Sequence, residues 1–206
     1  MTIRPYRPAD RDRLRQICRE TAAKPFQKTG RTLEAVTLIY NDYFTAYEPD
    51  HIFVLADESD RAVGYILCAA DYRGFVHCYR TTYLRRVLRT APDQAAGLLG
   101  YLWCLGKIKN RPVHFHLDIL PPYQRQGWGT RLMDTLCRHL RERGVDYLSC
   151  CGVSRNSAGY KCIANTALQR VTITAITPYL CPCGCKRNCK VDKCLSFWRT
   201  LSLLHK

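Results

Sequence analysis

Two histidines and an aspartate alternate with apolar residues in the segment VHFHLDI, residues 113–119. Strict alternation predicts a β-strand, and here one face of that strand carries His114, His116 and Asp118. Histidine titrates near neutrality and often acts as a general base, so such a face can accept and pass on a proton. The same side chains can equally be hydrogen-bonded polar groups of a sheet with no catalytic role, and the sequence leaves both interpretations open.

The turn QRQGWG, residues 124–129, follows this strand, and an amphipathic helical pattern that ends at Gly144 comes next. A turn between a strand and a helix start exposes backbone N–H groups, which together with the helix dipole favour a bound phosphate. Gly127 and Gly129 allow the backbone to approach a ligand closely. The glycine spacing matches neither the dinucleotide-binding fingerprint nor the Walker A loop. The turn therefore predicts an anion site of another kind.

The elements that must hold these residues are recognisable along the rest of the chain. Residues 75–110 have helical character and are interpreted as an insertion over one edge of the sheet, whose role is open. The other expected elements are a strand at 3–7, a helix that Asp10 caps, a helix at 32–47, a hairpin with its acidic turn at 57–60, and a strand at 145–153.

Length and composition limit the protein class. A chain of 206 residues with 47% hydrophobic residues can form one sizeable core. It contains neither a membrane-spanning stretch nor an apolar signal segment, so we expect a soluble, cytoplasmic protein. Of the Lys and Arg residues, 24 lie in residues 1–158 against 16 Asp and Glu, and 8 lie in residues 159–206 against one. The moderately basic body suits an anionic cofactor, and we expect neither nucleic acid nor a membrane as partner.

The context of the turn resembles the GNAT superfamily of N-acetyltransferases. Gln124, Gly127 and Gly129 fit every fixed position of the family's motif A, Q/R-x-x-G-x-G/A, and FVLADESDRAVGYILCAAD at 53–71 is similar to its hairpin. The resemblance covers roughly residues 1–158, taken as one domain. It implies a mixed α/β fold whose central, mostly antiparallel sheet splays apart at the cofactor site.

The resemblance also implies direct transfer of an acetyl group from acetyl-CoA to a primary amine. We expect no metal and either a monomer or a homodimer, although the sequence has no motif that selects the oligomeric state. In similar acetyltransferases that act on arylalkylamines, a histidine pair on this strand is associated with proton removal. His116 is the preferred base ahead of His114 and Asp118, because histidine titrates near neutrality and His116 lies nearer the expected splay. No motif selects one acceptor. The implied cofactor-binding residues are Ile119, Leu120, Gln124, Arg125, Gln126, Gly127, Trp128, Gly129, Thr130 and Asn156.

Residues 159–206 form a basic, cysteine-rich tail that departs from the family. After Asn156 the family's Tyr-x-Lys and Gly-Phe are missing, but residues 162–169 read one base earlier permit Tyr-Cys-Lys-His-Gly-Phe. One hypothesis is therefore an out-of-frame tail that follows a single-base deletion. The alternatives are a zinc- or nucleic-acid-binding protein that uses CPCGCKRNCKVDKC, and an inactive family member with a truncated C-terminal motif. The eight cysteines before this run are typical of buried apolar positions in a reducing compartment.

Overall fold

The computed structural model describes the backbone of residues 1–22, 30–106, 113–145, 148–151, 171–174 and 201–202. Its strands are β1 (Thr2–Pro5), β2 (Ile52–Ala56), β3 (Ala62–Ala69), β4 (His114–Ile119), β5 (Leu148–Cys151), β6 (Val171–Thr174) and β7 (Leu201–Ser202). Its α-helices are α1 (Arg11–Thr21), α2 (Arg31–Tyr40), α3 (Asp42–Tyr47), α4 (Tyr72–Cys78), α5 (Leu84–Thr90), α6 (Ala95–Gly106) and α7 (Trp128–Arg141). Short helical turns are η1 (Pro8–Asp10), η3 (Pro49–His51), η4 (Tyr79–Tyr83), η5 (Pro92–Gln94) and η6 (Pro121–Tyr123).

The described strands form one mixed sheet in the order β1-β2-β3-β4-β5-β6-β7. Strands β1 to β4 pair antiparallel with one another, β5 runs parallel to β4, and β6 runs parallel to β5. The short strand β7 pairs antiparallel with β6. The predicted mixed, mostly antiparallel α/β fold is therefore confirmed. Strand β4 stands at the change from antiparallel to parallel pairing, so its two edges have different neighbours.

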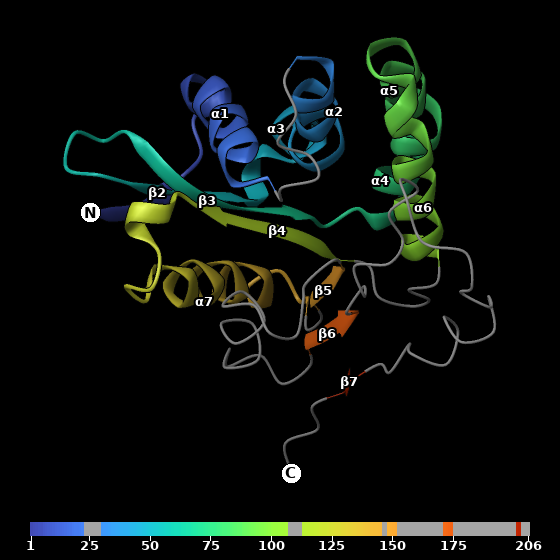
Figure 1. Ribbon diagram of the computed structural model, residues 1–206. Helices are drawn as coiled ribbons and strands as arrows, with labels where there is room; N and C mark the ends of the chain where they lie inside the picture. Colours follow the sequence, from blue (N-terminus) through green and yellow to red (C-terminus); the bar gives the residue numbers. More distant parts are fainter. Residues whose placement is uncertain (23–29, 107–112, 146–147, 152–170, 175–200, 203–206) are drawn as a thin grey trace.

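Helices cover the two faces of this sheet unequally. Helices α1, α2 and α3 lie on one face, α7 lies on the other, and α4, α5 and α6 stand together at one end of the sheet (Figure 1). The predicted helical character of residues 75–110 is confirmed for the part up to Gly106. This helical segment leaves the sheet at the end of β3 and returns at the start of β4.

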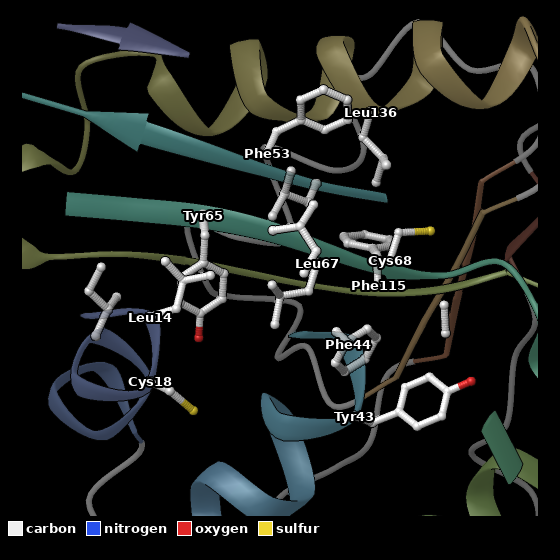
Figure 2. Close-up of a cluster of buried hydrophobic side chains, with 14 of the residues drawn as sticks. Leu14, Cys18, Tyr43, Phe44, Phe53, Tyr65, Leu67, Cys68, Phe115 and Leu136 are labelled. Atoms are coloured by element: carbon white, nitrogen blue, oxygen red, sulfur yellow. The ribbon is translucent and has the colours of Figure 1, made fainter. Parts of the chain in front are cut away.

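The core fills both faces of the sheet, as the pleat requires. Leu136 of α7 packs near Phe53 on one face, while Tyr65 points towards Leu14 and Cys18 of α1 on the other (Figure 2). Burial is nearly complete: Leu14, Tyr65 and Leu136 are all 0% exposed. Among the described cysteines, Cys18, Cys68 and Cys137 are buried and free, which confirms for these three that the sequence places cysteine in apolar positions.

Two local predictions are wrong. The single helix expected at 32–47 is broken at Asn41, whose φ of −133° and ψ of −51° separate α2 from α3. Asp10 does not cap α1 with its side chain, because its carboxylate instead accepts hydrogen bonds from the Arg7 amide and the Arg4 guanidinium. The expected strand at 3–7 is found two residues shorter at its end and one residue earlier at its start, at Thr2–Pro5.

The helix that follows the glycine turn ends as predicted. Gly144 has φ +72°, and its amide donates to Arg141 O while the Val145 amide donates to Leu140 O. This pair of bonds is the Schellman arrangement, which favours glycine at the left-handed position. The hairpin is also confirmed: β2 and β3 pair from Ile52↔Leu67 to Ala56↔Ala62, around a turn at residues 57–61.

Candidate functional site

Among the described residues, the outer edge of β4 is largely without a strand partner. β5 pairs with β4 only at His114↔Ser149, whereas β3 follows β4 from His114 to Ile119. The Leu120 amide donates to Val63 O of β3, so alternation along the strand directs the main-chain groups of Leu117 and Ile119 away from β3. These groups face the side on which β5 lies, where an extended ligand can bond to them, apart from Ile119 O, which accepts a hydrogen bond from the Gln124 side chain.

The glycine turn lies just beyond this edge and has the backbone of an anion site. Arg125 has φ +62° and Gly127 has φ +80°, so two left-handed residues turn the chain into α7. Within the described residues, the amides of Gly127, Trp128 and Gly129 have no protein acceptor, whereas the Arg131 amide is bonded across the turn to Gly127 O. Successive unpaired N–H groups at a helix start attract a phosphate.

Two glutamine side chains of the turn hold it in place through hydrogen bonds to backbone carbonyl oxygens. The Gln124 amide donates to Ile119 O at 2.6 Å, which ties the turn to the end of β4, and the Gln126 amide donates to Pro122 O at 3.0 Å. Behind them, the Arg131 guanidinium lies 4.6 Å from the centre of the Trp128 ring, which adds a positive charge beside the helix start. The turn is thus exposed to solvent, held by side-chain hydrogen bonds and close to the positive charge of Arg131.

The two strand histidines come together around a hydroxyl that the sequence analysis did not single out. Tyr101 Oη of α6 lies 2.7 Å from His114 Nε2 and 3.2 Å from His116 Nε2, and the two nitrogens are 3.1 Å apart. His114 is 0% exposed, and its Nδ1 is buried without a partner. Aromatic rings of Tyr40 and Phe44 stand edge-on to His116 at 5.4 and 5.5 Å.

Burial, more than any charge, sets the proton affinity of this pair. Desolvation lowers the pKa of His116 to about 4, and desolvation followed by the neighbouring His116 lowers the pKa of His114 well below its usual value. The expectation that His116 titrates near neutrality is therefore wrong, because the strand face that carries it is covered by helices. Both imidazoles are neutral at pH 7 and retain one lone pair each.

Asp118 lies on the same strand face but belongs to a different cluster. The Tyr65 hydroxyl donates to Asp118 Oδ2 at 2.6 Å, next to Cys18 of α1. Burial raises the pKa of Asp118 against the effect of hydrogen bonds from Tyr65 and Thr21. The predicted trio is thus split into a histidine pair with Tyr101 and a carboxyl held by Tyr65.

A cavity of about 420 Å³ opens beside the histidine pair, between α3 and α4. Phe75 contacts both Tyr43, which lines this cavity, and His114, at ring-centre distances of 4.9 and 5.6 Å. Glu48 also lines the cavity, and its carboxylate accepts hydrogen bonds from the Tyr43 hydroxyl at 2.8 Å and from the backbone amides of residues 70 and 71. The cavity is therefore one aromatic ring away from the histidines.

The structure places most of the predicted site residues along one line of the fold. Ile119 and Leu120 end β4, Gln124 to Gly127 form the turn, and Trp128, Gly129 and Thr130 begin α7. Asn156 and the tail from 159 to 206 fall outside the described residues, apart from the short strands β6 and β7. Tyr101 was not predicted from the sequence as a site residue. The local signal that could have indicated it is a polar hydroxyl in the otherwise apolar helix AAGLLGYLWCLG.

Sequence comparison matches this arrangement to a known family. A family model described as Acetyltransferase (GNAT) family matches residues 12–162. The chain belongs to this family. The GNAT acetyltransferases thus account for the splayed strand, the turn and the helix that follows it.

Solved structures agree with the GNAT assignment. The crystal structure of SsHAT is 32% identical, with a TM-score of 0.60 over 70% of this chain and 78% of that one. The apo form of a serine-to-alanine mutant of agmatine N-acetyltransferase is 14% identical, with a TM-score of 0.52 over 86% of this chain and 77% of that one, and shows the fold alone. A polyamine N-acetyltransferase of Drosophila melanogaster is 12% identical, with a TM-score of 0.49 over 86% and 77%.

The described residues also lack a membrane-spanning helix and a metal-ligand cluster. Every helix in this part of the GNAT chain is too short or too polar to cross a membrane. In the same ranges, no three His, Cys, Asp or Glu side chains come together as metal ligands. The cysteine-rich run that suggested a zinc module lies outside these ranges.

Proposed function

We propose that this GNAT protein transfers the acetyl group of acetyl-CoA directly to a primary amine. The observation that carries the proposal is the row of amides at 127–129 that have no acceptor in the described part of the chain, placed between the open edge of β4 and the start of α7. A diphosphate requires several donors that face one way, and a helix N-terminus supplies them with a favourable dipole. The basic composition of the chain is consistent with an anionic cofactor.

The cofactor would be held along the line already described. The main-chain amide of Ile119 would bond its extended arm, and the amides from Gly127 to Gly129 would bind its diphosphate. The main-chain groups of Leu120 and the Gln124 amide already have protein partners, so we expect these two residues to shape the site without bonding the cofactor through those groups. The Thr130 side chain lies in the first turn of α7, close to the same site. When bound, acetyl-CoA supplies an activated thioester, and the protein's task is to orient it and to move protons.

We assign proton exchange to the histidine pair, with His116 as the group that accepts the proton of the amine. His116 is neutral at pH 7, so its lone pair is available without prior loss of a proton. His114 is fully buried and supports His116 from behind. Asp118 takes no part in this proposal, because Tyr65 already occupies its carboxylate.

The acceptor is an amine that reaches the helix-covered face of β4. The agmatine and polyamine N-acetyltransferases among the similar structures carry amine substrates in their names, which fits an amine acceptor for this chain without selecting one. We further propose that residues 1–158 form the catalytic domain, in the cytoplasm, and that the residues from 159 onward are a divergent tail, of which β6 and β7 extend the sheet.

Binding of CoA to two matched glycine variants tests the proposal. Gly127 and Gly144 stand at the two ends of α7 with φ +80° and +72°, and a Cβ built on either meets no atom within 4 Å. Gly127→Val and Gly144→Val should therefore suffer a similar backbone strain of about 1–3 kcal/mol. Isothermal titration calorimetry should show CoA affinity lost in Gly127→Val and kept in Gly144→Val. Equal affinity in the two variants would sink the diphosphate assignment.

A further inference from the structure

The short contact between the two histidines fixes how many protons lie between them. His114 Nε2 and His116 Nε2 are 3.1 Å apart, which is a hydrogen-bond distance. Two N–H groups repel at this distance, and two lone pairs give no attraction, so one nitrogen donates and the other accepts. The pair therefore carries one proton on one Nε2 and a lone pair on the other.

The environment of His114 decides which nitrogen donates. His114 Nδ1 is buried with no partner, so a proton placed there would be an unsatisfied buried N–H. Buried N–H groups without an acceptor are rare, because the loss of hydration is not compensated. The His114 proton therefore lies on Nε2, where it donates to Tyr101 Oη at 2.7 Å and points towards His116.

His116 then has the opposite arrangement. Its Nε2 carries the lone pair and receives the Tyr101 hydroxyl hydrogen at 3.2 Å, so its own proton lies on Nδ1. In the described part of the chain, no hydrogen bond to His116 Nδ1 is present. This nitrogen is also not one of the buried polar atoms that lack a partner, so it faces accessible space. The only basic nitrogen of His116 is thus directed inwards, at Tyr101.

We propose that the Tyr101 hydroxyl relays to His116 the proton that leaves the acceptor amine. This inference rests on the proposed acetyl transfer. As the amine N–H bond breaks, its proton joins Tyr101 Oη, directly or through one water, and the original hydroxyl proton passes to His116 Nε2. Tyr101 stays neutral, His116 becomes an imidazolium, and its Nδ1–H can then release a proton on the accessible side.

His114 cannot replace Tyr101 in this step. It carries one proton, and giving that proton to His116 would leave an imidazolate anion in a fully buried position. A hydroxyl can donate and accept at once, so Tyr101 can lose one proton while it gains another. The role of His114 is to hold the Tyr101 oxygen so that its hydrogen points at His116.

Packing keeps the Tyr101 ring in the orientation that the relay requires. Tyr101 is 7% exposed, and its ring meets those of Tyr40 and Tyr79 at 5.6 and 6.2 Å. These contacts come from α2 and η4, which fix the ring on two sides. Tyr101→Phe keeps the same ring shape, so it removes the hydroxyl without emptying the site.

Steady-state kinetics of the full chain, with a panel of primary amines, provide the first test. Tyr101→Phe should lower kcat by about 100-fold, as expected for loss of one proton-transfer group, and leave KM for acetyl-CoA unchanged. Tyr79→Phe is the matched control, since it removes a buried hydroxyl that bonds Ile39 O in the same aromatic cluster. It should keep kcat within about 2-fold, because it leaves the proton path intact. A Tyr101→Phe enzyme with wild-type kcat, or with losses equal to the control, would overturn the relay.

Nitrogen-15 NMR of histidine-labelled wild-type protein provides a second test that needs no variant. The relay requires a protonated Nε2 on His114, and a protonated Nδ1 with an unprotonated Nε2 on His116. A protonated Nε2 on His116 in the neutral protein would contradict it. Failure of the proposed function would look different, because the wild-type chain would then not bind CoA, whereas the two tautomers are observed in the protein alone.

Discussion

Acidification should destabilise the folded protein through its buried histidines. The pKa of His116 falls to about 4 on folding, from the usual 6.5. Between these values the unfolded chain binds more protons than the folded one, so stability is fully present above pH 6.5 and decreases as pH falls towards 4. For His116 alone, the two values give a loss of about 2 kcal/mol between pH 7 and pH 5. His114 acts in the same direction, because its pKa is also lowered.

Urea unfolding followed by circular dichroism at pH 7, 6 and 5 measures this loss. The variant His116→Asn removes one titrating group, and should lose about 2 kcal/mol less than the wild type over that range. Asp42 and Asp118 contribute to the pH dependence of stability in the opposite direction, because their raised pKa values favour the folded state in acid. Both proteins contain these two residues, so the difference between wild type and variant does not include their contribution. His77→Asn, at an exposed imidazole, should retain the wild-type slope. Equal slopes for wild type and His116→Asn would show that His116 is not desolvated as the structure indicates.

Two further changes test the packing that positions β4. Gly64→Ala should lower the free energy of unfolding in urea by about 1–3 kcal/mol, because its Cβ would lie 2.9 Å from Ile119 Cγ1. The control Gly97→Ala lies in a helix, its Cβ meets no atom within 4 Å, and it should raise the free energy of unfolding by about 0.5–1 kcal/mol. Equal effects of the two variants would refute the close contact at Gly64. Arg15→Ala should cost about 3–5 kcal/mol, because Arg15 donates to the fully buried Asp42 carboxylate at 2.8 Å. A loss below about 1 kcal/mol would mean that this carboxylate is satisfied in another way.

The glycine turn could be predicted from the sequence because its geometry is local. Gly127 and Gly144 adopt the left-handed backbone that glycine permits most easily, and the helix between them follows from its apolar spacing. The break at Asn41 could not be predicted in the same way. Apolar residues continue at helical spacing through residues 32–47, and nothing in this pattern marks where the helix direction changes.

The histidine site was only half predictable, because its other half depends on tertiary contacts. Alternation places His114 and His116 on one strand face, but it does not indicate what covers that face. Tyr101 lies 13 residues before His114 and reaches it only because α6 packs at the end of the sheet. The low pKa of His116 has the same origin, since desolvation by packed helices cannot be read from a strand pattern.

Glu48 joins the helices α4, α5 and α6 to α3 at the point where the chain leaves β3. Its carboxylate accepts the Tyr43 hydroxyl and the amides of Ala70 and Asp71. A second tie lies further along, where the Tyr79 hydroxyl of η4 donates to Ile39 O of α2. Tyr101 lies in the last helix of this segment, so both ties restrict the movement of the helices that bring its hydroxyl to the imidazoles. Residues outside the reaction centre thus help to keep the hydroxyl and the two rings in register.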